Sequence, residues 1–194
     1  MRCPECGRRI SREPIVAATG ALVAVGFLNT VGLDWDLVPY LGFLLLSMAL
    51  LVTDLEAFRI VDRLNLRGTL ILAVGLAATG LAQGSAASLV RSLLGAGAYF
   101  LGALLLFLAV RGRGFGGGDV KLAVQLGLFA AFVSWGTLGW AVFGTAIIGG
   151  VISIGLLAIG AAKRDTELPY GPPMIIGTWL AIVLAGIGAF PIPT

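Results

Sequence analysis

Residues 122–162 read LAVQLGLFAAFVSWGTLGWAVFGTAIIGGVISIGLLAIGAA, and this run of 41 residues contains no charged side chain. One continuous helix of that length would extend about 60 Å, twice the ~30 Å thickness of a bilayer core. The run is therefore expected to cross a membrane twice, and Ser134-Trp135-Gly136 is the natural break between the two crossings.

The rest of the chain has the same apolar character. Of its 194 residues, 58% are hydrophobic and only 12% are charged, whereas soluble domains carry about 25% charged residues. A second sizeable soluble domain does not fit. Runs of 17–25 apolar residues are typical of membrane helices, and the expected spans are roughly 15–33, 37–53, 66–82, 87–110, 122–134, 137–162 and 171–190.

The basic residues orient these spans. With seven crossings and the N-terminus inside, Arg91 is the one positive residue of 13 that falls outside. Cytoplasmic loops carry the excess of Lys and Arg in membrane proteins. We therefore expect an all-α, polytopic transmembrane bundle of about six to seven helices. It comprises a cytoplasmic tail at 1–14 and a membrane domain at 15–194, with loops 54–62 and 116–119 at the cytoplasmic face.

Two acidic positions at that face are candidate functional residues, because placing an ionisable group near membrane depth costs free energy and usually marks a function. Asp119 follows Gly116, Gly117 and Gly118. It suits a helix N-cap, or an acid in a loop whose glycines permit positive φ or close approach to another backbone. The residue types alone leave both interpretations open. Lys121 suits either a partner for a carboxylate or a snorkelling side chain.

Asp54 also has two interpretations. Thr53-x-x-Glu56 matches a capping box for a short cytoplasmic helix, which would make Asp54 a first-turn acid. Alternatively, Asp54 ends the span that starts near residue 38 and converges with Asp119, so that the two acids share a proton and activate a water. Asp62 is expected to be a solvated or ion-paired loop residue.

Taken together, these motifs resemble the type IV prepilin peptidases, which are intramembrane aspartic peptidases with a GxGD motif. Asp54 and the following Ile60-Val61-Asp62 resemble the loop with the first catalytic Asp, although Val61 replaces the usual proline. Gly116-Gly117-Gly118-Asp119 resembles GxGD, and Pro169-Tyr170-Gly171-Pro172 resembles the Pro-Phe-Gly-Pro signature before the last helix. The resemblance implies that Asp54 and Asp119 form the catalytic pair, and that no cofactor is needed.

The N-terminal tail resembles the second Cys-x-x-Cys of the same family. Cys3 and Cys6 are the only cysteines, and the chain has no histidine. A structural zinc site takes four ligands, so these two make a half-site, and we expect no metal in a monomer. In the family this region is associated with N-methylation of the cleaved pilin. Because Cys3 and Cys6 make only one Cys-x-x-Cys pair here, we expect an enzyme without methyltransferase activity.

By resemblance, the substrates are prepilins or pseudopilins, cut on the cytoplasmic side of a bacterial inner membrane. Lipid is the other expected partner, and nucleic acid is not one. A small carrier or channel with acidic groups at a cytoplasmic vestibule is the non-enzymatic alternative. An aspartic peptidase for other single-span proteins is the enzymatic one. The oligomeric state is left open.

Overall fold

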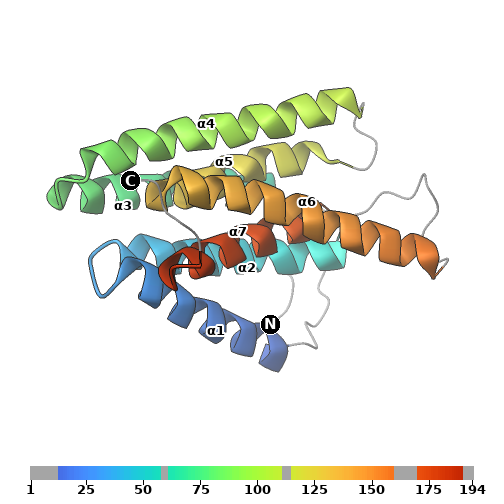
Figure 1. Cartoon of the computed structure of the whole chain (residues 1–194), viewed down its shortest axis with the longest axis horizontal. Coiled ribbons are helices and arrows are strands. Elements are labelled where there is room, and N and C mark those ends of the chain that lie inside the picture. The colour runs from blue at the N-terminus through green and yellow to red at the C-terminus, as the bar shows by residue number, and fades with distance from the viewer. Residues whose placement is uncertain (1–12, 58–60, 111–114, 160–169, 190–194) are drawn as a thin grey trace.

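The computed structural model describes residues 13–57, 61–110, 115–159 and 170–189, and these residues form helices without any strand. Figure 1 shows the helices lying along one long axis. The seven helices are α1 (Glu13–Val31), α2 (Leu37–Ala57), α3 (Asp62–Ala82), α4 (Ala86–Ala109), α5 (Gly117–Val133), α6 (Trp135–Ala158) and α7 (Gly171–Gly186).

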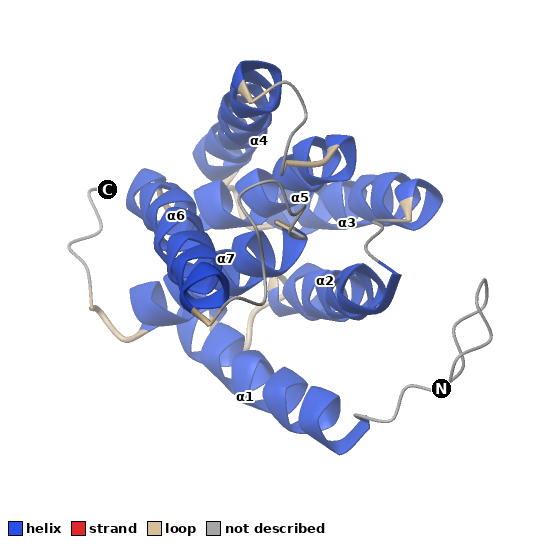
Figure 2. Cartoon of the chain, turned by 90° about the vertical axis from the view of Figure 1, so that its right-hand side faces the viewer, coloured by secondary structure: helices blue, strands red, loops and turns tan. Residues whose placement is uncertain are grey.

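The middle of the bundle is occupied by α5 and α7. Figure 2 looks along the bundle and shows the other helices arranged around these two. Of the 17 residues of α5, all but a few are buried, whereas α3 buries only Asn65, Leu76 and Gly80. Phe129 of α5 stacks on Phe43 of α2 with ring centroids 4.4 Å apart. The apolar residues of α5 therefore form part of the protein core. The helix is about 26 Å long, slightly shorter than the thickness of a bilayer core.

Four helical stretches are long and apolar enough to span a membrane: Leu37–Leu55, Asp62–Ala82, Ala86–Ala109 and Trp135–Ala158. Two shorter apolar stretches are Ala17–Val31 and Gly171–Gly186. Large apolar side chains such as Leu70, Ile71 and Leu105 are exposed on the outside of the bundle. Such a surface is suited to lipid, and the expected class, an all-α membrane bundle, is confirmed.

Several helix ends have a clear local cause. Gly32, Gly84 and Gly188 have φ of 80°, 72° and 67° and follow the ends of α1, α3 and α7. This left-handed conformation closes helix C-termini and favours glycine. Ser134 caps α6, since its hydroxyl accepts a hydrogen bond of 2.9 Å from the Thr137 N–H. The expected break at Ser134-Trp135-Gly136 is confirmed.

Three helix ends near the acidic positions lie four or five residues from the expected bounds. The second helix does not stop at residue 53, because α2 continues to Ala57. The Thr53 hydroxyl donates to the Leu50 carbonyl at 3.0 Å within α2. Of the two interpretations of Asp54, the one with a capping box at Thr53 is therefore wrong. Likewise, α3 begins at Asp62 and α5 at Gly117, where polar residues extend each helix beyond its apolar stretch.

Candidate active site

Three helix ends meet at one end of the bundle. They are the last turn of α2 with Asp54, the first turn of α5 with Asp119, and the first turn of α7 with Gly171. Both aspartates are buried, with 5% and 6% of their surfaces exposed. A Cβ atom added at Gly171 would lie 2.5 Å from Asp54 Oδ2 and 3.4 Å from Asp119 Oδ1. The two carboxyl groups therefore face the same small space.

Asp54 depends on α7 for its polar environment. A carboxylate in the last turn of a helix is disfavoured by the negative end of the helix dipole. Here the N-terminus of α7, the positive end of its dipole, lies beside the Asp54 carboxylate at Gly171. Among the described residues, Asp54 Oδ2 is buried without a hydrogen-bond partner. This unpartnered oxygen is the one that lies against Gly171.

Asp119 uses its two oxygens differently. Gly116 is the N-cap of α5, and its N–H donates to Asp119 Oδ2 at 2.9 Å. The Asp119 N–H in turn donates to the Gly116 carbonyl at 3.1 Å. Asp119 is thus the third residue of the helix and not its N-cap. It stabilises the helix start with Oδ2 and turns Oδ1 towards Gly171 and Asp54, so the capping contact and an acidic site coexist.

The ionisation of Asp119 is shifted by this environment. Asp119 precedes the apolar stretch of α5 and lies outside the four candidate spans. Burial raises its pKa to about 6, the Gly116 hydrogen bond opposes the rise, and the nearby Asp54 carboxylate adds to it. Two carboxyl groups that interact in this way titrate as a pair and can hold one proton between them.

The glycines before Asp119 do not have the expected backbone. Gly116 has φ −85° and ψ 152°, an extended conformation open to any residue, and Gly117 and Gly118 belong to the first turn of α5. A Cβ at Gly117 would meet no atom within 4 Å. Positive φ is therefore wrong for this segment, and Gly171 makes a close approach to the acids.

Lys121 lies near the acids in sequence but has another partner. Its Nζ forms an ion pair with Asp62 at the start of α3, and both side chains are more than half exposed. Of the two interpretations of Lys121, the structure selects a partner for a carboxylate. That carboxylate is Asp62 and not Asp119, and the ion pair links α5 to α3.

Tyr170, which directly precedes α7, contacts an aromatic ring that lies just before α5. The Tyr170 ring packs edge-on against Phe115, with centroids 5.3 Å apart. Pro172 is buried in the first turn of α7, where proline is favoured. Pro169, Cys3 and Cys6 lie outside the described residues, so the expectations for them stay predictions. Sequence reasoning missed Phe115, whose only signal is an aromatic residue next to the glycine run.

A helical membrane protein with two buried carboxyl groups beside one glycine has parts that can activate a water between them. Residues 40–154 match the model of the type IV leader peptidase family. This match includes both aspartates and more than half of the chain, and the protein belongs to that family of peptidases. Neither curated proteins nor solved structures show a significant similarity to the chain.

Proposed function

We propose that this protein is an intramembrane aspartic endopeptidase that removes the leader peptide from type IV prepilins or pseudopilins at the cytoplasmic membrane face. The observation that supports this most strongly is the position of Gly171, against which Asp54 Oδ2 and Asp119 Oδ1 both lie. Family membership supports leader peptides as the substrate class. The distribution of Lys and Arg supports the cytoplasmic face.

The chemistry is hydrolysis by two carboxyl groups and one water. The ionised carboxylate takes a proton from the water, and the oxygen of that water adds to the carbonyl carbon of the scissile bond. The protonated carboxyl group donates a hydrogen bond to the carbonyl oxygen. When the C–N bond breaks, a proton passes from the pair to the leaving amine. Asp54 and Asp119 share one proton before the water is activated, hold two after it, and return to one when the amine leaves, so neither is assigned a fixed starting state.

Co-expression with a candidate prepilin tests the proposal. The wild-type protein should shorten the precursor, and Asp54→Asn or Asp119→Asn should reduce cleavage below detection while the variant remains in the membrane. Asp62→Asn is the matched control, because Asp62 is acidic and close by but exposed and paired with Lys121. Normal cleavage by either of the first two variants would exclude the two-carboxyl mechanism.

An unrelated single-span protein should be included as a second substrate. Equal cleavage of both proteins would favour a general intramembrane peptidase over a leader peptidase. The carrier or channel alternative has no observation in its favour, since the family is one of peptidases. N-terminal sequencing of the product identifies the bond that is cut.

A further inference from the structure

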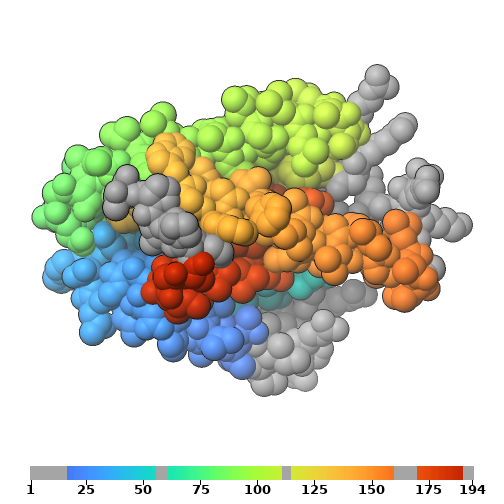
Figure 3. Space-filling model, in the orientation of Figure 1, coloured from blue at the N-terminus to red at the C-terminus, as the bar shows by residue number. Residues whose placement is uncertain are grey.

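An apolar groove with a volume of about 520 Å³ lies between α4 and α6. Figure 3 shows this side of the molecule, with α4 and α6 both at the surface. Among the residues that the structure describes, no charged side chain lines the groove. Its floor includes Tyr99, whose hydroxyl is hydrogen-bonded to that of Thr145 at 3.0 Å. The groove is therefore suited to an apolar segment and not to an ion or a polar solute.

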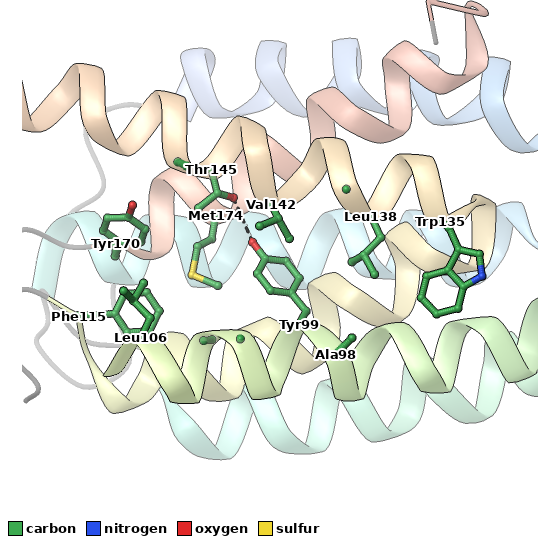
Figure 4. A pocket seen from close by; sticks show the side chains of 14 residues that line it. Ala98, Tyr99, Leu106, Phe115, Trp135, Leu138, Val142, Thr145, Tyr170 and Met174 are labelled. Atoms are coloured by element: carbon green, nitrogen blue, oxygen red, sulfur yellow. Dashed lines mark hydrogen bonds between the residues drawn. The ribbon is translucent and has the colours of Figure 1, made fainter. Parts of the chain in front are cut away.

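One end of the groove is formed by two residues that directly precede the glycines in contact with the two acids. Figure 4 shows Trp135 at one end and Phe115 with Tyr170 at the other. Phe115 directly precedes Gly116, whose N–H binds Asp119. Tyr170 directly precedes Gly171, against which both carboxyl groups lie. The groove thus ends at residues that lie one position in the chain before Gly116 and Gly171, the two glycines in contact with the acids.

The dimensions of the groove fit a helix. Along α6 it extends from Trp135 to Ala146, about 16 Å at ~1.5 Å per residue. Its two walls carry Gly102 and Gly139, and a Cβ at either position would meet no atom within 4 Å. Small residues at such positions let a neighbouring helix approach closely within a membrane. The groove is long enough to contact one face of a helix over roughly three turns alongside α4 and α6.

We infer that this groove binds the apolar helix of the substrate, namely the residues that follow the scissile bond. The inference rests on the proposed function. A substrate whose helix lies in the groove has its N-terminal end at Phe115 and Tyr170, so the bond before the helix reaches the two carboxyl groups. The other possible occupant, a lipid acyl chain, gives no reason for the groove to end at those residues.

Filling the groove tests this inference. Gly102→Leu and Gly139→Leu each add a side chain into the open space. Gly97→Leu on α4 and Gly155→Leu on α6 are matched controls, because these exposed positions are equally open but do not line the groove. We expect kcat/KM for a single-span precursor to fall about tenfold in both groove variants, mainly through KM, and to stay within about twofold in the controls.

A second measurement detects binding without cleavage. A photo-crosslinking amino acid is placed at 102, 139, 97 or 155 in the Asp119→Asn variant, and the membrane is irradiated with a tagged precursor. Adducts of the precursor at 102 and 139 but not at 97 and 155 are expected. Adducts with lipid only, or groove variants that cleave as well as the controls, would overturn the inference and leave the peptidase proposal intact. Groove adducts without cleavage by the wild type would instead contradict the proposed chemistry.

Discussion

Gly171 approaches Asp54 so closely that a methyl group at position 171 would lie 2.5 Å from the carboxylate oxygen Oδ2. A contact this short requires one of the two groups to move. Because Asp119 Oδ1 lies at 3.4 Å from the same point, a side chain at this position would press on one carboxyl group and contact the other. The first turn of α7 is thus part of the candidate site, although it carries no acidic residue.

Gly171→Ala is therefore expected to displace the Asp54 carboxylate and lower kcat at least about tenfold, since small misplacements of catalytic groups are costly. Gly155→Ala is the control, because a methyl group there meets no atom within 4 Å. Both variants should insert normally, as judged by the amount of monodisperse protein purified from membranes. Wild-type turnover by Gly171→Ala would show that the spacing of the two acids is not critical.

Replacing Asp119 by Asn should stabilise the protein while abolishing cleavage. The pKa of Asp119 is raised from 3.8 to about 6 in the folded state, so ionisation opposes folding. The wild type should lose stability as the pH rises from about 4 to about 6, by at most about 3 kcal/mol. Asp119→Asn lacks this titration.

The measurement is the thermal unfolding midpoint in detergent at several pH values. Below pH 4 the Tm of the two proteins should be similar, and above pH 6 the Tm of Asp119→Asn should be higher. A higher Tm for the wild type at neutral pH would mean that the Asp119 carboxylate is stabilised by groups other than the Gly116 N–H.

The ion pair between Lys121 and Asp62 is expected to contribute little. Both side chains are more than half exposed, and exposed ion pairs contribute about 0–1 kcal/mol. Asp62→Asn should retain at least about half of the wild-type cleavage rate and change Tm only slightly. A severe loss of activity with unchanged Tm would indicate that the pair positions α5 relative to α3 for catalysis.

Cys3 and Cys6 are expected to be dispensable for cleavage, because the proposed chemistry depends on Asp54 and Asp119 alone. The double variant Cys3→Ser/Cys6→Ser should cleave the precursor at the wild-type rate, and a metal chelator should have no effect on either protein. Inhibition by the chelator that is absent in the double variant would show that these cysteines bind a metal needed for activity.

The relation between sequence and structure is clearest at the two acids. Apolar runs and the position of Ser134 predicted about six to seven helices and the break between α5 and α6, because helix formation in a membrane depends on local hydrophobicity and length. The sequence also singled out Asp54 and Asp119 as unusual. It misplaced the ends of α2, α3 and α5, because polar first and last turns do not stand out from loops.

By itself, then, the sequence determined that this protein is a helical membrane bundle of the leader peptidase family with acidic residues at one face. Only the tertiary structure decided that Gly171 lies against both carboxyl groups, that Lys121 pairs with Asp62, and that a groove from Trp135 ends at Phe115 and Tyr170. The physical reason is that these relationships join residues far apart in the chain. They arise from how α2, α4, α5, α6 and α7 pack, which no local pattern of residue types encodes.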